Sequence, residues 1–183
     1  MKQFIAYKGR CFTIEWYFDD DGKSLVLEYF NSTSQGGPIG SDAPFAWQRG
    51  LDNYFNNGVY PQGWSYRSRG MGSPFITSIN ETDLPNTNNS YFDNNRVEAF
   101  YIASEWEINK TKILFKGSFA NAIGWYGKEF VPVKKMYSLA LFAQKPMKIL
   151  GYEATVKANI GYDQSEWYKN TLGGNIGISV PLF

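Results

Sequence analysis

The sequence has no histidine and only one cysteine among its 183 residues. Without histidine, the chain lacks the commonest general base and the commonest metal ligand. Cys11 has no second cysteine for an internal disulfide, and a lone thiol has no metal-site spacing. We therefore expect no catalytic residue, no bound metal and no cofactor, and the sequence does not favour a hydrolase or a metalloenzyme.

Long apolar runs and a charge imbalance are also missing. No stretch reaches the roughly 18 apolar residues that a transmembrane helix needs. The 18 basic and 17 acidic residues give no general attraction to nucleic acid, so no nucleic-acid partner is expected. The first eight residues do not have the pattern of a signal peptide. For an exported protein, this start predicts a fragment or an altered N-terminus.

Aromatic residues are abundant, with 6 Trp, 13 Tyr and 14 Phe, and there are 18 Gly. The mean hydropathy is nevertheless negative, at -0.38. Such a composition fits an all-β protein in which only alternate residues of each strand face an apolar environment. Composition alone does not separate a membrane barrel from a soluble β-sandwich or a carbohydrate-binding module.

Apolar and polar residues alternate most clearly over residues 150–163. This run exceeds the 5 to 6 residues that are usual in globular strands and satisfies the roughly 9 to 11 of a membrane-spanning strand. Less regular alternation elsewhere brings the expected total to about seven strands. These additional strands fall at residues 12–18, 25–29, 100–108, 112–125, 137–143 and 176–182.

The expected connections alternate between short and long. They are a tight turn at 19–23, a long connection at 32–96, a short turn at 109–110, a loop at 126–134, a short turn at 145–148 and a loop at 164–172. Outer-membrane barrels have this pattern, with tight periplasmic turns and longer extracellular loops. We therefore predict an all-β fold, an antiparallel outer-membrane β-barrel of which this chain is an incomplete C-terminal segment. Soluble sandwiches and lipocalin-like barrels remain the alternative.

The two ends of this predicted barrel segment carry further signals. Phe183 ends the chain after an alternating strand, which resembles the signal read by the barrel-assembly machinery, although the aliphatic residues are one position out of phase. The 32–96 connection is too long for an ordinary loop. It also contains many aromatic residues, unlike a disordered linker. We expect part of it to fold over the barrel mouth or into the lumen.

Three segments, at residues 28–38, 52–57 and 63–74, resemble the Wzi-type capsule-assembly family, and the resemblance extends over about 25–183. Ser68 and Met71 stand where the family pattern has Gly and Ile. The resemblance implies an outer-membrane barrel that holds or organises surface or capsular polysaccharide. Members of the family are considerably longer than this chain.

Residues 11–24 and 27–30 resemble the opening strand and helix start of RelE/HigB-type toxins, which are ribosome-dependent ribonucleases. The two resemblances overlap at 27–30. Either residues 1–24 are an unrelated toxin-like segment joined to a barrel segment at 25–183, or they form a native barrel hairpin. The sequence favours neither.

Sugar binding is the chemistry that the long connection predicts. A sugar site needs aromatic rings for the apolar C–H face and planar donors such as Arg for carboxylates and hydroxyls. The candidates are Trp47, Arg49, Asp52, Tyr54, Trp64, Tyr66, Arg67 and Arg69. The alternative is that these aromatic residues only pack the segment onto the barrel.

Other residues of the strands and loops have predicted places in a membrane barrel. Four aromatic residues are candidates for the interfacial girdle, and four charged residues for the lumen. The girdle candidates are Trp106, Trp125, Trp167 and Tyr168, and the lumen candidates are Glu105, Glu107, Glu153 and Lys157.

Together these patterns predict a non-enzymatic outer-membrane protein that contacts surface polysaccharide, with the lipid bilayer and the barrel-assembly machinery as its other partners. A toxin-like ribonuclease and a soluble β-sheet lectin are the alternative functions.

Overall fold

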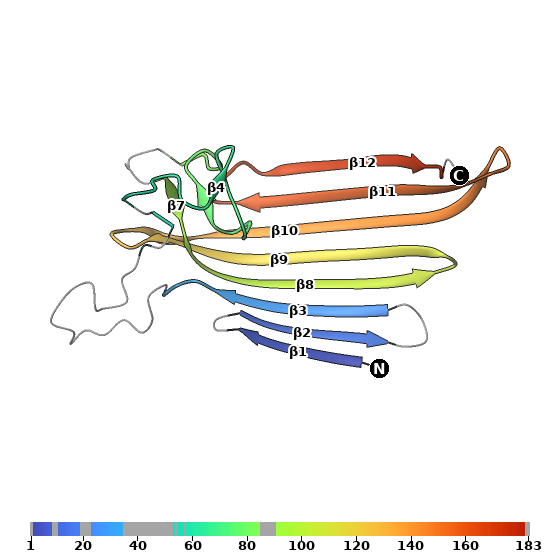
Figure 1. Ribbon diagram of the computed structural model, residues 1–183, viewed down its shortest axis with the longest axis horizontal. Helices are drawn as coiled ribbons and strands as arrows, with labels where there is room; N and C mark the ends of the chain where they lie inside the picture. The colour runs from blue at the N-terminus through green and yellow to red at the C-terminus, as the bar shows by residue number, and fades with distance from the viewer. Residues whose placement is uncertain are drawn as a thin grey trace.

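The computed structural model describes residues 2–8, 11–18, 23–34, 53, 55–56, 58–84 and 91–181, with side chains from residue 12 onward. The described chain is all-β and antiparallel and contains no helix. Eight strands form one sheet, in the order β1-β2-β3-β8-β9-β10-β11-β12 (Figure 1). Their bounds are Lys2–Lys8, Cys11–Phe18, Lys23–Asn31, Arg96–Ile108, Thr111–Trp125, Lys128–Ile149, Tyr152–Ser165 and Thr171–Ser179.

Four short strands lie within the connection between β3 and β8. β4 (Ser65–Tyr66) pairs with β5 (Arg69–Gly70), and β6 (Thr77–Ser78) pairs with β7 (Phe92–Asn94). Figure 1 shows this connection gathered at one end of the sheet, opposite the end that holds both chain termini. The prediction that part of the long connection is folded is therefore confirmed for its described residues.

The prediction of an all-β antiparallel chain is confirmed, but the strands differ from those expected. The sheet has an additional strand, β1, and β10 is 22 residues long. The turn expected at 145–148 is wrong: Pro146 pairs with Thr155 inside the ladder, and the reversal occurs at Leu150–Gly151. Both turn residues have positive φ, as a two-residue hairpin turn requires. The turn at Asn109–Lys110 is confirmed.

The loop expected at 126–134 is also wrong. β9 and β10 continue as a hairpin to the pair Trp125–Lys128, with a register shift between Glu129 and Lys134. The β9–β10 connection, at the end of the sheet that holds the long connection, is therefore an extended hairpin rather than an open loop. At the opposite end, the β8–β9 and β10–β11 turns have two residues each.

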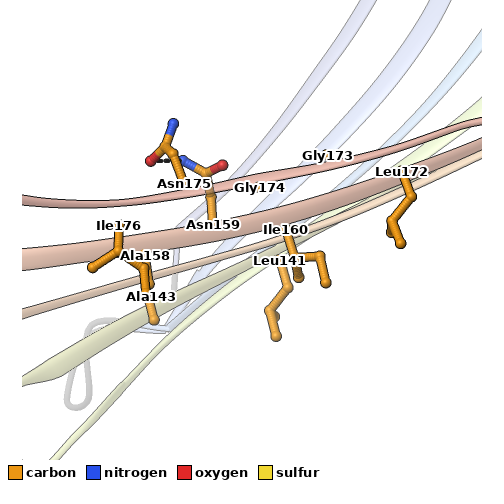
Figure 2. A pocket seen from close by; sticks show the side chains of 10 residues that line it. All are labelled: Leu141, Ala143, Ala158, Asn159, Ile160, Leu172, Gly173, Gly174, Asn175 and Ile176. Carbon is orange, nitrogen blue, oxygen red and sulfur yellow. Dashed lines mark hydrogen bonds between the residues drawn. The ribbon is translucent and has the colours of Figure 1, made fainter.

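The register places most large apolar side chains of the sheet on one side, which we call the apolar face. One row across β3, β8, β9 and β10 is Leu27, Ile102, Gly117 and Leu139. Another across β10 and β11 pairs Leu141 with Ile160. Figure 2 shows that Leu141, Ile160 and Leu172 project to the same side of β10, β11 and β12, whereas Asn159 and Asn175 project to the other.

The opposite side, the polar face, carries most of the charged residues of the long strands. Period-2 alternation places them there together, because successive side chains of a strand point to opposite faces. They are Glu28, Glu105, Glu107, Lys112, Lys116, Lys157 and Asp163. The three lumen candidates Glu105, Glu107 and Lys157 thus share one face, and Glu153 shares it by the same register.

The buried core lies on the polar face, at the end that holds the long connection. Small side chains of β8 and β9 are covered there by the connection and by the loop after β11. The cluster consists of Val97, Ala99, Ala120, Ala122, Met136 and Trp167, with Phe30, Phe75, Leu84, Phe130 and Tyr168 packed against it. Trp167 is 1% exposed. The prediction that Trp167 is a girdle residue is therefore wrong, because its ring is a core residue beneath the folded loops.

β1 and β12 are the two edges of the sheet, and no backbone pairing joins them in the described chain. β2 pairs with β3 from Cys11–Phe30 to Phe18–Lys23. The sheet is thus continuous across the predicted boundary at residue 24. Residues 23–31 form strand β3, so the helix start that the toxin resemblance implies is not present there.

Replacement of Trp167 by alanine tests the loop-end core. We expect Trp167→Ala to lower the free energy of unfolding by about 3–5 kcal/mol, because it leaves a cavity under the loops. Lys169→Ala is the matched control, since its ion pair with Asp83 is exposed and contributes about 1 kcal/mol or less. Urea titration followed by circular dichroism measures both. Equal stability of the two variants would contradict the packing described.

Candidate functional site

Half of the predicted sugar-binding residues can be placed. Trp64, Tyr66, Arg67 and Arg69 lie in or next to the β4–β5 hairpin. The other four candidates, Trp47, Arg49, Asp52 and Tyr54, lie outside the described residues. The structure thus brings together the second half of the candidate set on one short hairpin at the loop end of the sheet.

The hairpin reverses direction over two residues. Tyr66 pairs with Arg69, and the turn residues Arg67 and Ser68 have φ of 48° and 66°. Positive φ at both central positions is the geometry of a type I′ turn, which favours Asn or Gly. Glycine in the capsule-assembly pattern at position 68 would suit this backbone, and Ser68 adopts the same conformation at a steric cost.

The side chains of this hairpin face solvent. Trp64 is 53% exposed and Tyr66 is 65% exposed. The guanidinium carbon of Arg67 lies 5.4 Å from the centroid of the Tyr66 ring, a cation–π distance. An exposed ring with a planar cation beside it offers both an apolar platform and a donor fork to a carboxylated sugar.

Glu81 holds the β4–β5 hairpin in place through hydrogen bonds to backbone amides. One of its carboxylate oxygens accepts hydrogen bonds from the backbone amides of Gly70 and Ser78, each at 2.9 Å. The Ser78 hydroxyl donates to the Ser68 carbonyl at 2.7 Å, which holds the turn itself. A Cβ on Gly70 would lie 2.7 Å from the Ile76 carbonyl oxygen, so only glycine fits there. The exposed rings therefore stand on a rigid base.

A buried polar network, which the sequence patterns above do not predict, lies beneath this base. Residues 93–96 are all buried. The Asn94 amide donates to the Phe75 carbonyl at 2.9 Å and accepts from the Gly124 amide at 3.1 Å. The signal was the run Asp-Asn-Asn-Arg directly before a long strand, since Asn and Asp side chains readily take the place of backbone partners in loops.

Arg96 joins this network to the sheet. Its Nε donates to the Thr33 carbonyl at 2.8 Å, and its guanidinium forms an ion pair with Glu129. The guanidinium carbon also lies 4.2 Å from the centroid of the Tyr126 ring. Arg96 thus clamps the start of the long connection, the β9–β10 hairpin and β8 together.

Asp93 is the buried acid of the network. Burial raises the pKa of its carboxyl above the usual range, and hydrogen bonds from the hydroxyls of Thr82 and Thr77 oppose that shift. Because the pKa in the folded protein is above that of the unfolded chain, folding favours the protonated form.

An aromatic row borders the apolar face at the loop end. It crosses five neighbouring strands in direct register and consists of Phe12, Tyr29, Phe100, Phe119 and Tyr137. Ring centroids are 4.8 Å apart for Tyr29 and Phe100 and 5.0 Å apart for Phe119 and Tyr137. The next row outward on the same face is polar, namely Asn31, Glu98, Asn121 and Lys135.

Two residues of the polar row, Asn31 and Glu98, form hydrogen bonds with Tyr29 of the aromatic row. The Tyr29 hydroxyl donates to the Glu98 carboxylate at 2.5 Å and accepts from the Asn31 amide at 2.9 Å. Tyr29 therefore has an apolar ring on the sheet and a polar tip among hydrophilic groups, the arrangement typical of an interfacial aromatic. This row consists of Phe and Tyr, whereas tryptophans were predicted for such a position, and of those predicted tryptophans Trp106 lies on the same apolar face.

Comparison of the chain with protein-family models, curated proteins and solved structures finds no significant match. The resemblances to capsule-assembly barrels and to toxins therefore remain predictions. In the described part of the chain there is no helix long and apolar enough to cross a membrane. The same residues include no group of three or more acidic or cysteine side chains arranged to hold a metal ion.

The raised pKa of Asp93 predicts how the loop-end network responds to pH. The stability that protonated Asp93 contributes is present at low pH and is lost as the pH rises through its folded-state pKa. We expect protease cleavage of the long connection to quicken relative to Asp93→Asn as the pH rises from near the usual carboxyl pKa, about 4, toward neutrality. Asp93→Asn is the isosteric control, because it has no titrating proton. A constant ratio of the two rates would contradict this assignment.

Proposed function

We propose that this chain forms part of the wall of an outer-membrane β-barrel that retains surface polysaccharide without catalysing a reaction. One observation carries the membrane half of the proposal. The loops pack onto the polar face and leave the apolar face uncovered. A water-soluble sheet buries its apolar face instead, because that burial is the main driving force of folding.

The exposed residues of the apolar face support the proposal that this face contacts lipid. Its exposed members include Phe100, Ile102, Leu139, Leu141 and Ile160. The lining of a 710 Å³ hollow over β10–β12 includes Leu141, Ile160, Leu172 and Ile176 (Figure 2), which are apolar side chains suited to contact with acyl chains. Large continuous apolar patches on a protein surface indicate contact with another protein or with a membrane.

Strand length and the aromatic row favour the membrane over a protein partner. β8, β9, β10 and β11 have 13, 15, 22 and 14 residues, all longer than the roughly 9 to 11 that span a bilayer. The aromatic row followed by a polar row is the sequence of environments expected at a bilayer surface. The polar face would then line the lumen, where charged side chains stay hydrated.

The direction of the two edge strands supports closure of the wall. The eight strands of the sheet are antiparallel throughout. β1 begins and β12 finishes at the same end of the sheet (Figure 1), so the two edge strands run in opposite directions and could pair as antiparallel neighbours. A bilayer does not tolerate unpaired strand edges. We therefore propose that the two edges pair with each other or with further strands when the chain is in a membrane.

Polysaccharide retention is assigned to the β4–β5 hairpin. Trp64, Tyr66 and Arg67 are exposed at the loop end, which would be the extracellular side if the two-residue turns are periplasmic. The capsule-assembly resemblance supports the same assignment. Aromatic platforms with an adjacent guanidinium suit acidic sugars better than neutral ones.

Alanine variants test this assignment. We expect Trp64→Ala and Arg67→Ala each to weaken binding of polygalacturonate by roughly tenfold, equivalent to about 1.4 kcal/mol, because each removes one element of the platform. Tyr152→Ala and Lys148→Ala are the controls, since both residues are exposed at the opposite end of the sheet. Binding is measured by sedimentation of the detergent-solubilised protein with the polymer, with dextran as the neutral polymer. Wild-type binding by both hairpin variants would count against the site.

A further inference from the structure

A second hollow lies over the polar face, between β8 and β11. It has a volume of 270 Å³, and its polar and aromatic lining consists of Glu105, Lys112, Phe142, Gln144, Lys157 and Asn159. These residues come from two adjacent rows of the sheet. Glu105, Phe142 and Asn159 belong to one row, and Lys112, Gln144 and Lys157 to the next.

The charged side chains of this hollow are unpaired. Within the described chain, Glu105, Lys112 and Lys157 form no ion pair, although Lys148, Lys169 and Arg96 do. Lys112 and Lys157 flank Gln144 on the two neighbouring strands, so their backbones are two strand spacings, about 10 Å, apart. An anion between them would be reached by both ammonium groups.

Phe142 is the unusual member of the set. It is a large aromatic residue on the polar face, directly opposite Leu114 of β9, and it is 37% exposed. Lys116 Nζ lies 5.5 Å from the centroid of its ring. A partly exposed ring surrounded by amides and cations is the combination that binds the C–H face of a sugar.

The two amides complete the lining. Asn159 Nδ2 donates to Asn175 Oδ1 at 3.0 Å, which orients the Asn159 side chain and leaves its oxygen as an acceptor (Figure 2). Gln144 stands between the two lysines. Pockets for drug-sized ligands have volumes of about 300–1,000 Å³. A hollow just below that range suits a single sugar unit.

We propose that this hollow binds one carboxylated sugar unit on the lumenal face. Phe142 stacks on the ring of the sugar, Lys112 and Lys157 neutralise its carboxylate, and Gln144 and Asn159 exchange hydrogen bonds with its hydroxyls. Glu105 accepts from a hydroxyl and disfavours ligands of higher negative charge, such as phosphate. The site deepens the proposed function and rests on it, because it adds a second contact for the same acidic polymer below the β4–β5 hairpin.

The test uses the full chain in detergent micelles, titrated with glucuronate, glucose and inorganic phosphate and followed by saturation-transfer NMR. Glucuronate should bind, and glucose and phosphate should bind at least tenfold more weakly. Lys112→Gln and Lys157→Gln should each weaken glucuronate binding by about tenfold, and Phe142→Leu should also weaken it, because it removes the ring that packs on the C–H face of the sugar. Lys148→Gln is the matched control, because it makes the same charge change on β10 outside the hollow.

Two results would overturn the assignment: equal binding of phosphate and glucuronate, or wild-type affinity in both lysine variants. A separate gel assay of the same samples, run with and without boiling, reports whether a closed barrel forms. A heat-dependent mobility shift without glucuronate binding would refute this site and leave the membrane proposal standing. Lysine-dependent binding without the shift would support the site and contradict direct pairing of β1 with β12.

Discussion

The structure depends on the alternation of side chains along strands that are in direct register. Because successive residues point to opposite faces, a run such as residues 152–163 separates apolar from polar side chains on one strand. Register then aligns these runs across the eight strands, and a slip by one residue would exchange the two faces of a strand. Everything else follows from this separation: the loops find small side chains and hydrogen-bonding partners on the polar face and leave the other face uncovered.

The all-β antiparallel fold could be predicted from the sequence because period-2 alternation is a direct consequence of strand geometry. Strand ends were predicted less well. Pro146 lies inside β10 although proline usually ends a strand, and the true turn at Leu150–Gly151 contains a leucine with positive φ. Residues 2–8 have little alternation of their own, and they join the sheet as the first arm of a hairpin with β2, paired from Lys8–Cys11 to Lys2–Tyr17.

The sequence predicted the types of residue in the candidate site, but it predicted their positions in the structure only in part. Trp64, Tyr66 and Arg67 do lie together and exposed, since they are neighbours in sequence on one hairpin. The network of residues 93–96, which supports that hairpin, depends on partners 11 to 63 positions away. Trp167 could not be distinguished from an interfacial tryptophan by sequence, because both environments favour the same ring. The hollow around Phe142 combines four strands and is visible only once their register is known.

The most direct test of the central claim is a labelling scan of positions 139–142 on β10. Single cysteines are introduced into a Cys11→Ser background, labelled with an environment-sensitive fluorophore and reconstituted into phospholipid vesicles that contain spin-labelled acyl chains. The account predicts strong quenching and blue-shifted emission at Leu139 and Leu141, and weak quenching at Ala140 and Phe142, because successive residues face lipid and lumen in turn. Equal quenching at all four positions, or quenching confined to Ala140 and Phe142, would contradict it.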